Sequence, residues 1–175
     1  MMKRVVECTV MLAVAVAAGG CFFSRAPQLE INEYAPELRP ASRMLTAMQI
    51  GSVVNLSGSG REFVIRKKNG KVICDESRRW LIAPEQMLKN AMLIHSSSTG
   101  ADRVSAEILK FEFSSDMGEL STLVRFRFRS VNSRNEMCCV AAVAVKVSDG
   151  DYGRSAAALW EKLLNETFNK DKMVK

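Results

Sequence analysis

The segment from Leu120 to Val131 alternates almost strictly in side-chain character, and from Val124 to Arg129 apolar and basic residues follow each other in turn. Residues two apart along a strand lie on the same face of a sheet. One face would therefore carry Leu120, Val124, Phe126 and Phe128, and the other Arg125, Arg127 and Arg129. This pattern predicts a strand that packs on a core with one face and presents arginines on the other.

Two flanking segments also predict strands. From Val104 to Phe113 the apolar positions change phase after Ile108, which indicates a bulge or burial of both faces. From Met137 to Val147 the chain is apolar on both faces, the pattern of a central strand that is covered on both sides.

Earlier in the chain, Leu45–Leu56 predicts a first strand. Glu62–Lys67 and Lys71–Asp75 flank Lys68, Asn69 and Gly70. Asn-Gly tolerates the positive φ of a tight turn, so this segment predicts a β-hairpin.

Two segments have helical periodicity. Pro84 suits the first position of a helix. Helical spacing relates Met87, Leu88, Ala91, Met92 and His95, and the segment Ser96–Gly100 stops the helix. The second helix carries an apolar stripe of Tyr152, Ala156, Leu159, Trp160, Leu163, Leu164 and Phe168. The expected fold class is α/β, a mixed and largely antiparallel sheet of five to six strands packed with two main helices.

The first twenty residues have the pattern of a signal peptide. Lys3 and Arg4 precede an uncharged stretch from Val10 to Ala18, and Ala17–Gly20 supplies small residues directly before Cys21. The apolar stretch is shorter than the roughly 20 residues that a membrane-spanning helix needs. The segment resembles a bacterial lipobox, which implies that Cys21 is the lipid attachment site; the alternative is an ordinary secretory signal with a coincidental cysteine.

The expected organisation is a signal peptide (1–20), a lipidated N-terminus and tether (21–43), one α/β domain (44–170) and a tail (171–175). Pro27, Pro36 and Pro40 mark the tether, in which a short strand near Leu29–Tyr34 is an option. The formal net charge of +6 favours an anionic lipid or an acidic protein surface as partner, and nucleic acid is not expected.

Three cysteines remain in the domain: Cys74, Cys138 and Cys139. One bridge from Cys74 to Cys138 or Cys139 is possible in an oxidising compartment. The alternative is three buried thiols that act as small apolar side chains.

The sequence does not predict an enzyme, and neither a metal nor a cofactor is expected. Motif patterns for a nucleophile elbow, a phosphate-binding loop or a paired-histidine metal helix are not found. His95 is the single histidine and has no identifiable catalytic partner, so we expect it to be a polar residue at a helix end.

Two groups are candidates for partner binding. Arg125, Arg127 and Arg129 recur about 6.8 Å apart and could meet carboxylates or lipid phosphates; the alternative is a solvated or salt-bridged sheet face. Arg78, Arg79 and Trp80 precede the first helix as a possible contact anchor, and the alternative is that Trp80 is buried under the sheet.

The segment Arg78–Leu88 (RRWLIAPEQML) resembles the tryptophan segment of the ABC-type transport auxiliary lipoproteins, the PqiC-like family associated with MCE systems. A second similarity lies in Ala106–Glu112, and the resemblance covers most of Val53–Phe168. It implies a non-catalytic accessory of an ABC/MCE-type lipid transport system that docks to a periplasm-spanning MCE protein.

The resemblance also implies a location on the periplasmic face of the outer membrane, with the inner membrane as the alternative; Phe22 after the cysteine is compatible with outward sorting. The expected partners are an MCE-domain protein or ABC transporter components, the membrane through the lipid anchor, and other copies of the chain. The competing hypothesis is a stand-alone envelope-assembly or stress lipoprotein that binds another envelope partner.

Overall fold

A computed structural model describes residues 30–36, 38, 46–130 and 136–168, and of residues 46, 47, 95 and 97–101 it describes the backbone alone. Cys21 and the predicted signal peptide lie outside these residues. Residues 31–175 form one compact unit that is distinct from residues 1–30.

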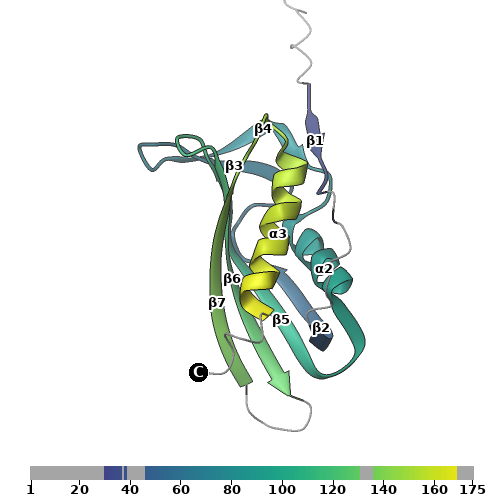
Figure 1. Ribbon diagram of the computed structural model, residues 1–175. Coiled ribbons are helices and arrows are strands. Elements are labelled where there is room, and N and C mark those ends of the chain that lie inside the picture. The colour runs from purple at the N-terminus through teal and green to yellow at the C-terminus, as the bar shows by residue number, and fades with distance from the viewer. Residues whose placement is uncertain (1–29, 37, 39–45, 131–135, 169–175) are drawn as a thin grey trace, which may run out of the picture. The chain divides into compact units, whose positions relative to one another are not determined.

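The compact unit is a mixed seven-stranded sheet with two described helices. This confirms the predicted α/β fold class, with one strand more than the five to six expected. Figure 1 shows both helices on the same side of the sheet. The elements are β1 (Asn32–Tyr34), β2 (Thr46–Asn55), β3 (Glu62–Arg66), β4 (Val72–Trp80), α2 (Pro84–His95), β5 (Ser96–Ser114), β6 (Glu119–Ser130), β7 (Glu136–Lys146) and α3 (Tyr152–Phe168). No described helix is long and apolar enough to cross a membrane.

The strand order is β1-β4-β3-β5-β6-β7, and β2 also pairs with β5. β2 pairs with the Ser96–Ile108 part of β5, and β3 pairs with Phe113 and Ser114 at its end. The long pairings β5·β6 and β6·β7 are antiparallel, whereas β2 and β3 run parallel to β5. β5 thus forms the centre of the sheet, and β6 lies between it and β7.

Three local predictions are confirmed. β3 and β4 form the expected hairpin, with Gly70 at φ 78° in the turn and Lys67 N–H donating to the Lys71 carbonyl at 2.8 Å. Pro84 begins α2. The register of β5 shifts between Ile108 and Lys110, at the predicted phase change.

The core lies between the helices and the side of the sheet that they cover. The α3 stripe is buried as predicted, except that Tyr152 is only partly buried. It packs with Phe126 and Val124 of β6 and with Leu88 of α2. The core residues of β6 are those that the alternation assigned to the apolar face, so the arginines lie on the opposite face.

Two predictions about the sheet are wrong. β7 is an edge strand and not a central one, because only β6 pairs with it among the described strands. The domain also begins before residue 44, because β1 pairs with β4 in parallel, with Tyr34 opposite Trp80. Tyr34 contributes to the aromatic core, and its ring centroid lies 5.5 Å from that of Phe63.

Candidate functional site

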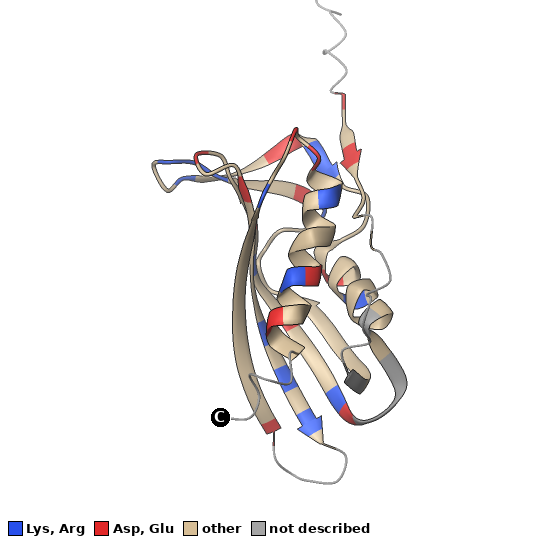
Figure 2. Cartoon of the chain, viewed as in Figure 1, with Lys and Arg blue, Asp and Glu red and all other residues tan. Residues whose placement is uncertain are grey.

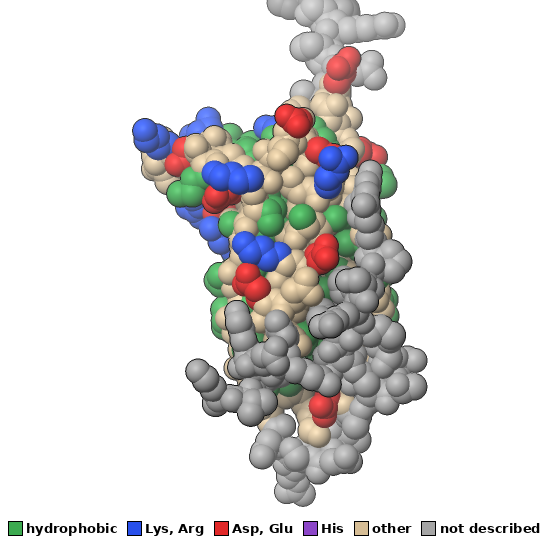
Figure 3. All heavy atoms as spheres, viewed as in Figure 1, with side chains coloured by type: hydrophobic (Ala, Val, Ile, Leu, Met, Phe, Trp, Pro, Cys, Tyr) green, Lys and Arg blue, Asp and Glu red, His purple; other side chains and the backbone are tan. Residues whose placement is uncertain are grey.

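The side of the sheet without helices carries most of the candidate residues. Its side chains come from alternate positions of β5, β6 and β7, and it is called the arginine face below for Arg103, Arg125, Arg127 and Arg129. Figure 2 shows basic residues recurring along β6. On the side that carries α3, by contrast, basic, acidic and apolar side chains are interspersed (Figure 3).

Glu107 of β5 partly neutralises the arginine face. Its two carboxylate oxygens accept hydrogen bonds from Arg125 Nη1 at 3.0 Å and from Arg127 Nη2 at 2.6 Å. The arginine side chains are 41% and 46% exposed, and that of Glu107 is 19% exposed. One carboxylate thus orients two guanidinium groups that remain open to solvent.

Arg103 and Arg129 lie directly opposite each other on β5 and β6. Both are exposed, and neither lies within ion-pair distance of a carboxylate belonging to a described residue. Like charges that face each other across two strands destabilise the pairing. An anion bound between them would relieve this repulsion, and the planar guanidinium group matches a carboxylate or phosphate.

A hollow of about 310 Å³ opens on this face. Residues from β2, β5 and β6 and the first residue of β7 line it: Ser52, Val54, Arg103, Ser105, Ala106, Glu107, Arg127, Arg129 and Glu136. The predicted arginine stripe therefore forms part of a surface site, with polar and apolar groups beside the charges. Arg103 and Glu107 were not predicted, because their position beside the stripe depends on the register of β5 against β6.

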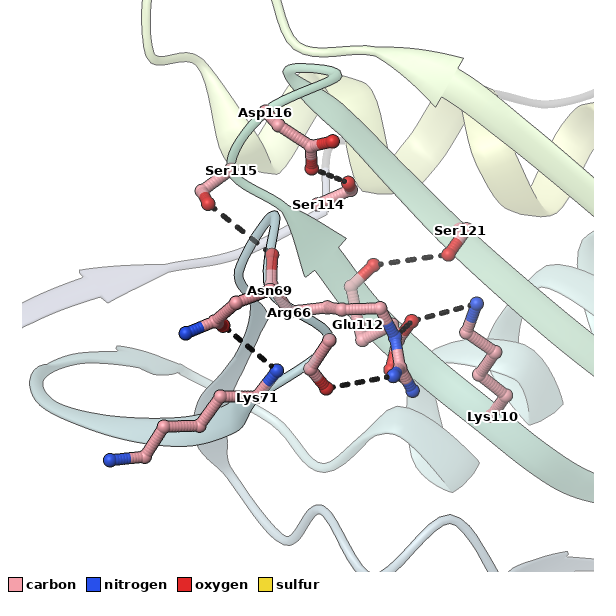
Figure 4. A network of polar contacts seen from close by, with 10 residues as sticks. Arg66, Asn69, Lys71, Lys110, Glu112, Ser114, Ser115, Asp116 and Ser121 are labelled. Carbon is pink, nitrogen blue, oxygen red and sulfur yellow. Dashed lines mark hydrogen bonds and ion pairs between the residues drawn. The ribbon is translucent and has the colours of Figure 1, made fainter.

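A second polar cluster lies on the helix-free side of the hairpin and is shown in Figure 4. Arg66 donates from Nε and Nη2 to the two oxygens of Glu112 at 2.6 and 2.9 Å, and Lys110 Nζ lies 2.7 Å from Glu112 Oε1. Glu112 is only 5% exposed. Burial raises the pKa of Glu112, but the hydrogen bonds and charges of Arg66 and Lys110 outweigh it, so that the pKa lies below its ordinary value of 4.5.

The substitution Glu112→Gln tests this cluster. A carboxyl group with a depressed pKa stabilises the fold above its ordinary pKa, and this stabilisation is lost as the pH falls through the lower folded value. We expect the variant to lose about 1–2 kcal/mol of the free energy of unfolding at pH 7, less than for a fully buried pair because Arg66 and Lys110 are partly solvated. Denaturant unfolding below pH 4.5 should show a shallower decline in the variant than in the wild type. Parallel pH profiles of the two proteins would contradict the assignment.

Trp80, the last residue of the segment Arg78–Trp80, is packed inside the domain. Trp80 is 1% exposed and stacks on Phe63 with ring centroids 4.5 Å apart. The prediction that Trp80 contacts a partner is therefore wrong in this structure, and its alternative, burial, is confirmed. The reason is that β4 turns Trp80 towards the helix-covered side of the sheet, where it meets the aromatic core.

Arg78 and Arg79 are both engaged within the domain. Arg78 donates to Asp75 Oδ2 at 2.7 Å and to the Tyr152 hydroxyl at 2.8 Å, and its guanidinium lies over the Phe63 and Tyr152 rings. Arg79 Nε donates to Glu33 Oε1 of β1 at 2.6 Å. Arg78 thus connects β4 to α3, and Arg79 connects β4 to β1. Arg79 remains 42% exposed, and its predicted role in partner binding stays a prediction.

The cysteines do not form the possible bridge. Cys74 lies on β4 and Cys138 and Cys139 lie on β7, with β3, β5 and β6 between them, and all three thiols are free. The alternative of three buried thiols is also wrong, because Cys74 and Cys138 are exposed and only Cys139 is partly buried. Burial raises the pKa of Cys139.

Acid–base chemistry would need titratable side chains such as those of His95 and Asp75. The side chain of His95 lies outside the described part of the structure. Asp75 accepts hydrogen bonds from the Ser77 hydroxyl and from Arg78, which hold its pKa below the ordinary value. Such a carboxylate stays ionised near neutral pH and is a poor general acid.

Comparison with known proteins gives a fold likeness. No protein-family model matches the chain, and no curated protein sequence matches it. A protein from Xanthomonas campestris described with the family model DUF330 superposes with a TM-score of 0.58 at 13% identity, over 79% of this chain and 91% of its own. A second solved structure, an uncharacterized protein, gives a TM-score of 0.58 at 14% identity, over 83% of this chain and 100% of its own. The chain therefore shares its fold with these two proteins.

Proposed function

We propose that this protein is a membrane-anchored lipoprotein and a non-catalytic accessory of an ABC/MCE-type lipid transport system. Lipid chains on Cys21 would hold the domain at the periplasmic face of the outer membrane. The arginine face would dock to a periplasm-spanning MCE protein. The domain would bind and orient its partner without making or breaking covalent bonds.

The arginine face is the observation that carries the docking proposal. Both described helices pack on one side of the sheet, and no described helix covers the other side. Four arginines share that side with Glu107, which pairs with two of them, and with Glu136, which lies opposite Arg129 on β7 without forming an ion pair with it. An acidic surface would therefore find more guanidinium groups than are internally paired. Rows of opposite charge accelerate association and fix orientation.

The lipid anchor expected at Cys21 also supports a role at the membrane surface. Each acyl methylene buried in a bilayer contributes about 0.8 kcal/mol, and two or more chains give lasting attachment. A domain held this way meets its partner at a membrane surface, where even a modest intrinsic affinity suffices because the effective concentration is high.

Chemical cross-linking in membranes, followed by affinity purification of the full chain, tests the docking. We expect an MCE-domain protein among the recovered partners. The double variant Arg103→Ser with Arg129→Ser should recover roughly tenfold less of it, because a hydrogen bond to a charged group contributes about 1.5–3 kcal/mol. The matched control is Lys68→Ser with Lys89→Ser, which removes the same charge from the hairpin turn and from α2, away from the arginine face.

Two results would count against the proposal. Equal recovery with both double variants would exclude docking through the arginine face. Recovery of a different envelope protein, such as an outer-membrane barrel, in place of an MCE-domain protein would favour the competing hypothesis of a stand-alone envelope lipoprotein.

A further inference from the structure

β7 combines two properties that conflict. It lies at the edge of the sheet and pairs only with β6 among the described strands, so one side of its backbone has no strand partner there. Its sequence is nevertheless uncharged from Met137 to Val145, which is the pattern of a strand with neighbours on both sides. Met137 and Val140 are 53% and 58% exposed.

The other edges of the sheet have protective features that β7 does not share. β1 pairs only with Arg78–Trp80 of β4, so the preceding part of β4 is an edge. That part carries the charged residues Asp75 and Glu76. β2 is interrupted by two register shifts against β5. Natural sheets use such charges and irregularities to prevent pairing between edges. β7, in contrast, pairs with β6 without a register shift over its whole length.

One protective contact occurs near the end of β7. Lys162 of α3 donates to the carbonyl of Ala144 at 3.0 Å. A carbonyl oxygen has a second lone pair and can accept another hydrogen bond. The uncharged segment from Met137 to Val143 has no comparable lysine contact among the described residues. Most of this edge is thus suited to pair with another strand.

The charged residues at the two ends of β7 indicate what kind of strand would pair with it. Glu136 stands at one end and Lys146 at the other. If two copies of β7 run antiparallel and are centred on Ala141, Glu136 of each copy lies opposite Lys146 of the other. The same register places Val140 opposite Ala142 and Cys138 opposite Ala144. A strand with opposite charges at its ends and small apolar residues between them is self-complementary.

We propose that β7 pairs antiparallel with β7 of a second copy of this chain. The contact is isologous, because the same strand serves on both sides of a two-fold axis. In an antiparallel pair this axis is perpendicular to the sheet, so each face of one copy continues into the same face of the other. The two arginine faces then join into one basic surface with Val140 of both copies at the seam. The pairing does not depend on the proposed transport role.

Light scattering of the full chain in detergent solution tests the pairing. We expect a dimer in the wild type. Val140→Lys should weaken dimerisation about tenfold or more, since it places like charges close together across the seam. Val72→Lys is the matched control, because Val72 is also an exposed strand valine, 46% exposed, but lies on β4. A wild type that stays monomeric across the micromolar range, or a dimer that Val140→Lys leaves unchanged, would overturn the proposal.

Disulfide trapping tests the register and does not depend on the folding of a charged variant. Ala144→Cys places a thiol opposite Cys138 of the second copy, so mild oxidation should give a covalent dimer. The further change Cys138→Ser should abolish this cross-link. If oxidation yields only monomer, or if the cross-link persists after Cys138→Ser, the antiparallel register centred on Ala141 is wrong.

Discussion

Trp80→Ala is expected to lower the free energy of unfolding by about 3–5 kcal/mol, the usual cost of truncating a buried aromatic side chain. Trp80 is 1% exposed. Its ring contacts those of Phe63, Tyr34 and Phe111, at centroid distances of 4.5, 6.5 and 5.3 Å. The cavity would lie where β1, β3, β4 and β5 meet the helices. Urea denaturation of the purified protein measures the loss.

The adjacent Leu81 provides a matched control for this substitution. Leu81 is 46% exposed. Leu81→Ala should therefore change the free energy of unfolding by roughly 0.5 kcal/mol or less. Similar losses for the two variants would mean that the aromatic cluster around Trp80 does not stabilise the fold.

Cys21→Ser is expected to move the protein from the membrane fraction to the soluble periplasmic fraction. The serine cannot carry the thioether-linked lipid, so the methylene contributions that hold the chain at the bilayer are lost together. Cell fractionation with immunoblotting measures the distribution. Cys8→Ser is the matched control, because it changes a cysteine within the expected signal peptide and leaves Cys21 in place.

The outcome of that experiment separates the anchor from other modes of membrane binding. If Cys21→Ser stays in the membrane fraction to the same extent as the wild type, the basic domain itself or another segment holds the protein there. If Cys8→Ser and Cys21→Ser behave alike, Cys21 has no special role.

Local sequence patterns predicted much of the fold. The Asn69–Gly70 turn, the start of α2 at Pro84 and the apolar stripe of α3 each depend on residues close together in the chain. The alternation in β6 also separated the buried face from the arginine face correctly, because the period of two belongs to the strand itself.

Features that depend on strand order were not predictable in this way. The apolar pattern of β7 indicates burial but does not say which element covers it, and β7 proved to be at the edge. The distance between Cys74 and the β7 cysteines likewise follows from strand order. The short strand considered near Leu29–Tyr34 is present as β1, but the sequence assigned it to the tether, and only its pairing with β4 places it in the domain.

The residues of the candidate site likewise divide into those that a local pattern identifies and those that only the strand register brings together. The arginines of β6 were identified from their spacing, whereas Arg103, Glu107 and the β2 wall of the hollow come from other strands through long-range register. The segment Arg78–Trp80 was predicted as a contact anchor for a partner, with burial of Trp80 as the alternative. The sequence does not reveal that Arg78 meets Tyr152 of α3, which lies 74 residues along the chain.

Mass spectrometry of the mature protein, purified from membranes, tests whether Cys21 carries lipid. We expect a polypeptide that begins at Cys21 and carries a diacylglyceryl group. A mature chain with an unmodified cysteine, recovered from the soluble fraction, would contradict membrane anchorage and with it the proposed place in lipid transport.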